Sequence, residues 1–292
     1  MHRFLKNVLT TLLLTLLLAI IADIGIKAFF VFYSKRSKVD VEWRNASVVF
    51  FGSSRVVHSV ATKQFSEITG RSAYNMGWAA SNPREIYAAL KIYLSKNSKP
   101  DYVLIQIDAE HDILDEDELA MQSLLKYYYS GLIDDYFDEK TKLEMSIPLY
   151  ASIIHRDFGW REILKTMINN KPADDSLYGY VPIFRSYHEN NASKRPVLMD
   201  TCFRAPNPWI RKAIDICKDR NIKVILFTSP IYKLENPNYL SRFSMYKEDY
   251  LNLSESLSDS AYFKDYMHVN NSGALLFTEE LSKRFLEITG RN

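Results

Sequence analysis

Residues 47–55 of the chain read Ser-Val-Val-Phe-Phe-Gly-Ser-Ser-Arg. The apolar run that ends at Phe51 and stops at Gly52 predicts a short, fully buried strand followed by a tight turn. Ser54 then lies at a strand-to-helix turn, where a hydroxyl is exposed and backbone N–H groups are close by. Such a turn can supply a nucleophile and part of an oxyanion hole. Because Gly-Ser-Ser also occurs in ordinary turns, this stretch alone leaves its chemistry open.

The chain on either side of this turn alternates between strand and helix patterns. Further strands are predicted over 72–76, 101–107 and 221–229, and helices over 84–94, 208–220 and 272–288. This alternation predicts the α/β class, as a flavodoxin-like α/β/α sandwich whose mostly parallel sheet has helices on both faces. The interval 113–204 breaks the rhythm, and we interpret it as a large insertion over one end of the sheet. It is either substrate-binding material or packing against the core.

The N-terminal segment differs from the rest of the chain and predicts a membrane anchor. Residues 7–33 are almost entirely apolar, interrupted by Asp23 and Lys27. They are long enough to cross a bilayer as a helix, with Lys27 close enough to the far end to reach the interface. A cleaved signal peptide is the alternative, although the run lacks a small-x-small cleavage site. We expect an uncleaved transmembrane anchor with its flank over 1–38 and a catalytic domain over 39–292.

The composition excludes several classes of protein. The 292 residues are 47% hydrophobic and 25% charged, with 9 Gly, 10 Pro and 2 Cys. This scarcity of Gly, Pro and Cys excludes collagen-like, low-complexity and disulfide-scaffold chains. A net charge of +2 without a basic stripe argues against nucleic-acid binding. The two cysteines, Cys202 and Cys217, do not settle the redox compartment.

A second motif lies just ahead of the C-terminal helix, where Asp265 and His268 are three residues apart on one predicted loop. A serine that transfers an acyl group needs a base within hydrogen-bond reach, and the base needs a carboxylate to fix its tautomer. The spacing lets the carboxylate of Asp265 fold back onto the imidazole of His268. The alternative is a surface histidine and a solvated acid, because Asn270, Asn271 and Ser272 can cap the helix without them.

A third group of candidates follows the strand predicted over 72–76. The N–H of Gly77 and the side-chain amide of Asn82 are donors of the kind that an oxyanion hole uses. The alternative for Asn82 is to cap the helix that Pro83 opens. Arg55, directly after the serine turn, is interpreted either as a residue that steers an anionic substrate or as a solvated charge at a helix start.

Taken together and in this order, these residues resemble the SGNH/GDSL hydrolase superfamily. The Gly-Ser-Ser turn at 52–54 is similar to the family's first block, with Ser in place of Asp. The resemblance implies that Ser54 is the nucleophile and that Gly77 is an oxyanion donor. It also implies that Asp265 and His268 complete the catalytic set.

The resemblance covers about residues 46–112 and 205–290, and it departs from the family in the third block. Where the family has Gly-x-Asn-Asp, residues 109–112 read Ala-Glu-His-Asp. The usual oxyanion asparagine is missing, and His111 or Asn82 would have to replace it. The acids around His111 could also suggest a metal site, but no second histidine lies at ligand spacing. We therefore expect no metal and no other cofactor.

Membrane-anchored relatives with a Gly-Ser-Ser turn look most like the cell-envelope branch, which includes proteins of alginate O-acetylation and of D-alanine transfer to teichoic acids. This likeness implies a catalytic domain outside the cytoplasmic membrane of a bacterium, an acylated envelope glycan as substrate and a membrane-bound O-acyltransferase as partner. Our hypothesis is a serine-dependent acyl esterase or O-acyltransferase, with acetyl as the expected acyl group. The alternative is a catalytically silent, SGNH-like scaffold or glycan-binding protein in a membrane assembly.

Overall fold

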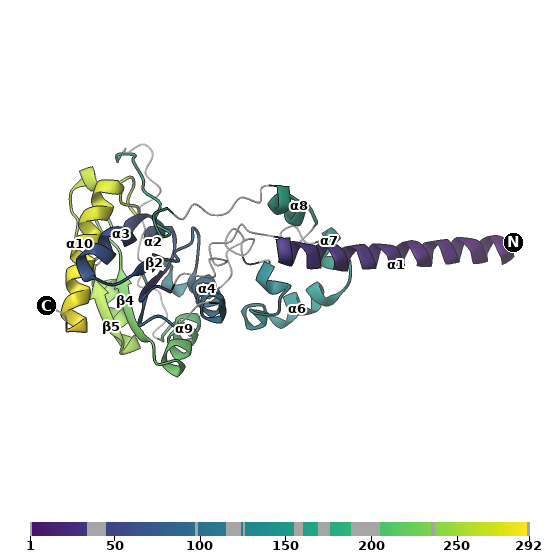
Figure 1. Ribbon diagram of the computed structural model, residues 1–292, viewed down its shortest axis with the longest axis horizontal. Helices are drawn as coiled ribbons and strands as arrows, with labels where there is room; N and C mark the ends of the chain where they lie inside the picture. Colours follow the sequence, from purple (N-terminus) through teal and green to yellow (C-terminus); the bar gives the residue numbers. More distant parts are fainter. Residues whose placement is uncertain are drawn as a thin grey trace. The chain divides into compact units, whose positions relative to one another are not determined.

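The computed structural model describes residues 2–33, 45–96, 99–114, 124, 126–154, 160–168, 176–187, 205–234 and 237–290. The chain divides into two compact units (Figure 1). The first, called the helical unit here, comprises residues 1–37 and 121–173. The second, the α/β unit, comprises residues 38–120 and 174–292. Each unit is therefore built from two stretches that are separate in the sequence.

The α/β unit is built around a five-stranded sheet in the order β2-β1-β3-β4-β5. Its strands are β1 (Val48–Phe51), β2 (Ala73–Asn75), β3 (Tyr102–Gln106), β4 (Lys223–Thr228) and β5 (Asp249–Asn252). All neighbouring strands run parallel, with Val48 opposite Ala73 on one side and Tyr102 on the other. The predicted α/β fold with a parallel sheet is confirmed. The carboxyl ends of the strands consequently meet at one edge, where α/β proteins place their sites.

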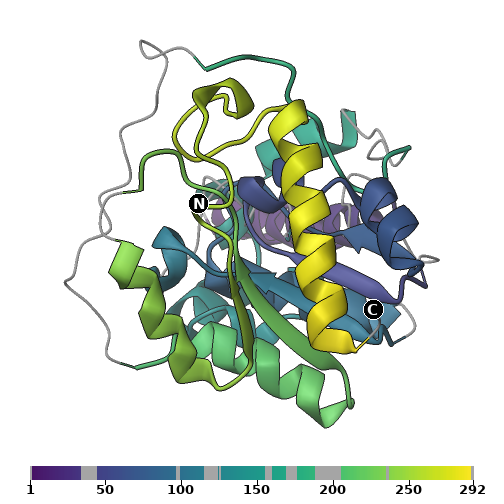
Figure 2. The same ribbon diagram turned by 90° about the vertical axis from the view of Figure 1, so that its left-hand side faces the viewer.

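Helices cover both faces of this sheet (Figures 1 and 2). One face carries α2 (Ser54–Ser59), α3 (Thr62–Thr69) and α10 (Asn271–Thr289), and the other carries α4 (Pro83–Lys96) and α9 (Pro208–Asp219). The 3-10 helices of this unit include η2 (Ala109–Asp112), η5 (Pro237–Tyr246) and η6 (Ser260–Tyr262). The side chain of Asn207 caps α9 by accepting from the N–H of Trp209, and Pro208 opens the helix. The unit is a three-layered sandwich.

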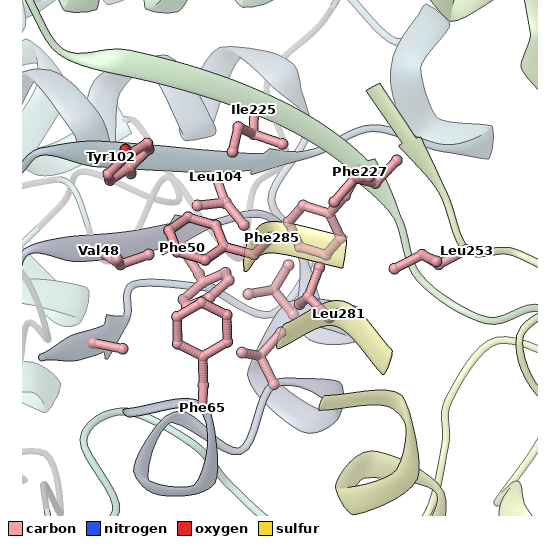
Figure 3. Packing of buried hydrophobic residues seen from close by; sticks show 14 of the residues in the cluster. Val48, Phe50, Phe65, Tyr102, Leu104, Ile225, Phe227, Leu253, Leu281 and Phe285 are labelled. Carbon is pink, nitrogen blue, oxygen red and sulfur yellow. The ribbon is translucent and has the colours of Figure 1, made fainter. Parts of the chain in front are cut away.

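The core between the sheet and α10 is rich in aromatic rings (Figure 3). Phe50 on β1 meets Phe65 on α3 edge to face, with ring centroids 5.0 Å apart. Phe65 in turn meets Phe285 on α10, with centroids 5.3 Å apart. Such pairs contribute about 0.5–1.5 kcal/mol each beyond their buried area. All of β1 is buried, which explains why its sequence is continuously apolar. The buried strand also fixes the position of the turn that follows it.

The helical unit contains α1 (His2–Tyr33), η3 (Asp134–Tyr136), α6 (Glu139–Ser146), α7 (Tyr150–Ile154) and α8 (Trp160–Ile168). α1 is long and apolar enough to cross a membrane. The predicted N-terminal apolar helix is therefore present. The predicted insertion, 113–204, is divided between the two units, because residues 121–173 belong with α1 and the residues from 174 onward belong to the α/β unit.

Residues 176–187, called the strap here, lie on the α/β unit. The strap accepts a hydrogen bond from the N–H of Asn75 at the end of β2 (2.9 Å) and another from the N–H of Asn271 at the start of α10 (2.6 Å). It donates a third to the carbonyl of Val57 on α2 (3.0 Å). This part of the predicted insertion therefore ties β2, α2 and α10 together.

Candidate active site

Ser54 is the first residue of α2, directly after the turn that leaves β1. Ser53 caps the helix, because its Oγ accepts a hydrogen bond from the N–H of Arg55 (3.3 Å). Close packing requires a glycine at position 52, since a Cβ on Gly52 would lie 2.6 Å from Oε1 of Gln106. The predicted turn between strand and helix is present, and it places the serine hydroxyl at the helix start.

The structure brings Ser54 together with His268, which is 214 residues further along the chain. The Oγ of Ser54 lies 2.8 Å from Nε2 of His268. Nδ1 of the same ring lies 2.9 Å and 3.1 Å from the two carboxylate oxygens of Asp265. With Nδ1 donating to Asp265, Nε2 carries the lone pair that can accept the serine proton. This arrangement can activate a serine for attack on an acyl carbonyl.

The loop that carries Asp265 and His268 folds back on itself, as their spacing predicts. The Oδ1 of Asp265 accepts hydrogen bonds from the N–H groups of Met267 and His268, each at 2.9 Å. Burial by itself raises the pKa of Asp265, but the hydrogen bonds from the imidazole and from these two N–H groups outweigh it and lower the pKa to about 2. The carboxylate is therefore ionised at neutral pH and can stabilise a protonated imidazole.

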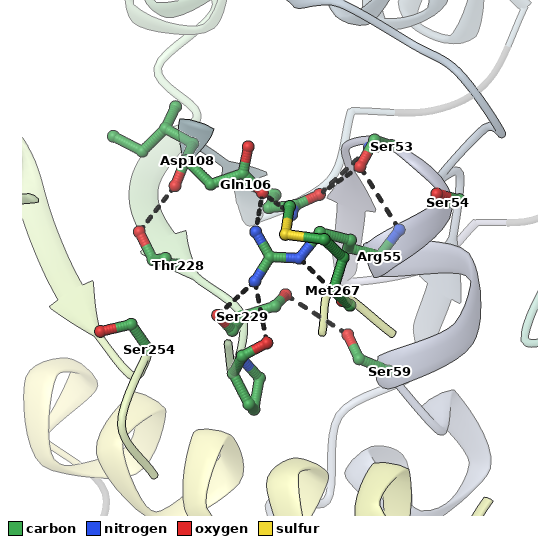
Figure 4. Close-up of polar contacts among 12 residues, drawn as sticks. Ser53, Ser54, Arg55, Ser59, Gln106, Asp108, Thr228, Ser229, Ser254 and Met267 are labelled. Carbon is green, nitrogen blue, oxygen red and sulfur yellow. Dashed lines mark hydrogen bonds and ion pairs between the residues drawn. The ribbon is translucent and has the colours of Figure 1, made fainter. Parts of the chain in front are cut away.

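Arg55 lies inside the protein, with only 2% of its surface exposed. Its guanidinium donates to the carboxylate of Asp108, after β3, and to the carbonyls of Ser229 and Pro230, after β4 (Figure 4). Its Nε donates to the carbonyl of Met267 in the histidine loop (3.1 Å). The structure differs from both sequence interpretations, because this guanidinium is enclosed by protein groups and neither faces solvent nor is open to a substrate. Arg55 instead connects three loops beside Ser54.

Two further polar residues, Gln106 and Asp108, support this arrangement, although neither was predicted as a catalytic or oxyanion residue. Gln106, the last residue of β3, accepts from the N–H of Ser53 (3.1 Å) and from its hydroxyl (3.2 Å). Its amide group donates to the carboxylate of Asp108. Both Gln106 and Asp108 are buried. A glutamine inside an otherwise apolar strand, followed by an acid at the strand's end, is the sequence signal that could have found them.

The two backbone N–H groups predicted as oxyanion donors, those of Gly77 and Ser54, lie in different surroundings. The N–H of Gly77 donates to Oδ1 of Asn75 (2.9 Å), so it is engaged by a protein group. The N–H of Trp78 donates to the carbonyl of Gly52 (2.8 Å), which holds this loop beside the serine turn. In the part of the chain that the structure describes, the N–H of Ser54 has no hydrogen-bond partner, as expected in the first turn of a helix. It is the donor adjacent to the Ser54 hydroxyl.

Asn82 lies at the start of α4. Its backbone N–H donates to the carboxylate of Glu85 (2.9 Å), and its carbonyl accepts from the N–H of Ile86 (3.1 Å). The first of these bonds is the reciprocal half of a capping box. Asn82 is therefore part of a helix start, which is the alternative that the sequence left open for it.

His111 is buried and held by neighbouring side chains. Its Nε2 is bonded to the hydroxyl of Tyr246, and its Nδ1 lies 3.2 Å from Oδ1 of Asp112. Burial is the main cause that lowers the pKa of His111 to about 4, so the ring is neutral at neutral pH. Neither nitrogen is bonded to Ser54, although the structure describes both residues. Among the described residues, no group of three or more His, Cys, Asp or Glu could hold a metal ion.

Comparison with known proteins finds no matching family model and no matching curated protein. Solved structures similar to this chain include three of 12–14% identity. A Streptococcus pneumoniae protein described as a platelet activating factor aligns over 96% of this chain and 99% of its own, with a TM-score of 0.43. A protein described as lipolytic and of the G-D-S-L family, from Desulfitobacterium hafniense, aligns over 81% and 97% (TM-score 0.41). One from Bacteroides fragilis, described as an acylhydrolase, aligns over 87% and 92% (TM-score 0.37). At such low identity and TM-score, these structures do not assign a function to this chain.

Proposed function

We propose that the chain is a serine-dependent acyl esterase or O-acyltransferase of the SGNH type. The observation that carries this proposal is the continuous hydrogen-bonded series from Ser54 through His268 to Asp265. The Oγ of Ser54 attacks the carbonyl carbon of an ester while Nε2 of His268 takes the hydroxyl proton. The ionised Asp265 stabilises the resulting imidazolium, which then gives its proton to the departing alcohol.

The acyl group is then held as an ester on Ser54. In the second half of the reaction, water or a sugar hydroxyl attacks this ester, and His268 takes the proton of the incoming group. His268 returns that proton to Ser54 as the acyl group leaves. We assign the N–H of Ser54 as a donor to the oxyanion. Gly77 stays a predicted second donor, and its participation requires that its N–H leave Oδ1 of Asn75.

We further propose that the substrate is an acetylated polysaccharide or another envelope glycan. In this proposal α1 is an uncleaved single-pass anchor in a bacterial membrane, and the α/β unit lies outside the cytoplasm. A membrane-bound O-acyltransferase would supply or receive the acyl group. The sequence resemblance supports the substrate and the partner, and the length and apolar character of α1 support the anchor.

The test uses the full chain in detergent micelles with p-nitrophenyl acetate and a fluorophosphonate probe. We expect the wild type to release nitrophenol and to be labelled by the probe. Ser54→Ala should lose both reactions, because only the nucleophile forms the covalent bond. Ser256→Ala, which removes another hydroxyl of the same unit, serves as the matched control and should react as the wild type does.

Two results would count against the proposal. Labelling that persists in Ser54→Ala would show that another residue reacts. A folded wild type that neither hydrolyses the ester nor accepts the probe would favour the silent scaffold, which the missing third-block asparagine supports. Adding a soluble glycan acceptor to a reactive wild type then separates transfer from hydrolysis by the appearance of acetylated glycan.

A further inference from the structure

Asp23 is a buried acid in the apolar helix α1, with only 1% of its surface exposed. Its carboxylate accepts hydrogen bonds from Nζ of Lys27 (2.8 Å) and from Nε1 of Trp160 (3.0 Å). It also accepts from the hydroxyl of Ser152 and from the N–H of Leu149 (3.4 Å). A carboxylate facing lipid would be costly, whereas this one is surrounded by donors. Asp23 is therefore a point at which protein, rather than lipid, covers the helix.

The exposure of α1 changes along its length. Leu9, Leu13 and Leu17 are 59%, 58% and 52% exposed, whereas Phe30 is 1% exposed. Twenty-one helical residues from position 2 to position 22 span about 32 Å, which matches a hydrocarbon core of about 30 Å. Arg3 and Lys6 in the first two turns are long enough to reach the headgroups, and this span lies closer to the N-terminus than the apolar run over 7–33 predicted. The whole of α1 would span about 48 Å and is too long for it. Asp23 is the first buried residue of α1, and from there protein covers one side of the helix, at Asp23 and Phe30, while Ile24 and Phe29 on its other side are 59% and 52% exposed. The part before Asp23, which has no buried residue among those described, is the part that fits a bilayer.

The linker after α6 and the first four residues of α7, together residues 147–153, are fixed at the level of Asp23. Two of the donors to that carboxylate, the Leu149 N–H and the Ser152 hydroxyl, belong to this segment, which we call the α6–α7 corner. Figure 1 shows α7 beside α1 within the helical unit. Ile147 and Ile153, at the two ends of the corner, are 46% and 69% exposed. The corner therefore presents apolar side chains next to the place where the apolar run of α1 ends.

We propose that the bilayer surface lies at Asp23 and that the α6–α7 corner rests on it, with Ile147 and Ile153 in contact with phospholipid. The inference rests on the proposed membrane span of α1. A bilayer is the partner that fits, because the lipid surrounding the first part of α1 ends beside these two isoleucines. Lys27, one helical turn beyond Asp23 and 5.4 Å from the ring centre of Tyr129, then lies on the aqueous side. Residues 121–173 act as a collar that sets the depth of α1 in the membrane.

The test places a single NBD fluorophore on the full chain in vesicles of phosphatidylcholine and phosphatidylglycerol. Cysteines are introduced at Leu13, Ile147, Ile153 or Leu276 after Cys202→Ser and Cys217→Ala have removed the native thiols. Leu276, on α10 of the α/β unit, is 40% exposed and is the matched control for an exposed apolar position. Nitroxide lipids then quench the fluorophore, with the nitroxide either deep in the acyl chain or near the headgroup.

We expect the deep nitroxide to quench the label at Leu13 and the shallow nitroxide to quench the labels at Ile147 and Ile153, with Leu276 unaffected. Labels at Ile147 and Ile153 that are quenched no more than the label at Leu276, while Leu13 is quenched, would overturn the inference and leave the span intact. An unquenched label at Leu13 would overturn the proposed span and the inference together.

Discussion

Three loops of the candidate site converge on the guanidinium of Arg55. It joins the loop after β3, through Asp108, to the loop after β4 and to the histidine loop, through the carbonyl of Met267. Because Arg55 directly follows Ser54, the proposed nucleophile, its position also fixes the start of α2. A buried ion pair of this kind is costly to break, since the partner is left charged inside the protein.

We predict that Arg55→Met lowers the free energy of unfolding by about 3–5 kcal/mol, because the carboxylate of Asp108 loses its partner. Chemical denaturation of the full chain in micelles measures the loss. Arg71→Met is the control, since Arg71 pairs at 3.3 Å with the exposed Asp101, and its loss should be below about 1 kcal/mol. Adding Asp108→Asn to Arg55→Met should recover part of the stability. If the double variant instead loses the sum of the unfolding free energies lost by the two single variants, the pairing of Arg55 with Asp108 would be contradicted.

The lowered pKa of Asp265 predicts a pH dependence with a definite sign. Since the folded state lowers this pKa to about 2 from its ordinary value, ionised Asp265 stabilises the fold at neutral pH. That contribution is about 2 kcal/mol, is complete above about pH 4 and is lost as the pH falls toward about 2. The free energy of unfolding, measured as a function of pH, should show this loss in the wild type and not in Asp265→Asn. Asp219→Asn, which changes an exposed acid, is the control and should behave as the wild type does.

Asp265→Asn also predicts a catalytic defect. The carboxylate fixes the His268 tautomer with its lone pair on Nε2, so its replacement should lower the rate of ester hydrolysis by about 10⁴-fold, as tautomer reversal does in serine proteases. Steady-state hydrolysis of p-nitrophenyl acetate measures the change. A decrease of less than about tenfold would show that Asp265 does not orient the base.

At the scale of elements, the strap depends on one glycine. Gly179 has a φ of +85°, and a Cβ there would lie 2.0 Å from the carbonyl oxygen of Asn75 at the end of β2. The strap also bonds to α2, which carries the proposed nucleophile Ser54, and to the start of α10, which follows the loop of His268. Its attachment therefore bears on the positions of α2 and of that loop.

We predict that Gly179→Ala detaches the strap from β2. Gly70→Ala is the matched control, because Gly70 also has a positive φ, of +66°, but a Cβ there meets no atom within 4 Å. The control should cost only the left-handed backbone penalty of about 1–2 kcal/mol. Hydrogen exchange over 176–187 should rise in Gly179→Ala and not in Gly70→Ala. Equal exchange in the two variants would show that the contact with Asn75 does not hold the strap.

At the scale of the whole molecule, the helical unit is assembled from the N-terminus and from the middle of the chain. Removing residues 1–37 to obtain a soluble enzyme therefore removes the helix that residues 121–173 pack on. Trp160 and Ser152 then lose the carboxylate of Asp23, which accepts their hydrogen bonds. Ile163, which is fully buried in the full chain, belongs to the same unit, and this unit has lost its longest helix.

We predict that a chain starting at residue 38 aggregates or binds detergent, because the faces of α7 and α8 are uncovered. Replacing residues 121–173 of the same chain by a short Gly/Ser linker should restore a monodisperse protein that the fluorophosphonate still labels at Ser54. Size-exclusion chromatography with light scattering compares the two. A monodisperse chain from residue 38 would show that residues 121–173 do not need α1.

Much of the fold follows from local pattern. The continuous apolar run of β1 and the helical spacing of Ile86, Leu90 and Leu94 in α4 each reflect burial by the neighbouring layer, so the strand and the helix could be predicted. β5 was not predicted, because as an edge strand only Leu251 of its four residues is buried and it has no apolar run. The close pairing of Asp265 with His268 was also predictable, since three residues of loop suffice to bring them together.

The sequence by itself thus determined the parallel α/β class, the apolar N-terminal helix and the residues proposed as nucleophile, base and orienting acid. Only the tertiary structure decided that Ser54 and His268 meet at 2.8 Å, that Arg55 is buried and that residues 121–173 belong with α1. The reason is physical. Periodicity and turn chemistry act between neighbours in the chain, whereas contacts across 214 residues and the burial of a charge depend on which strand ends and helices pack side by side.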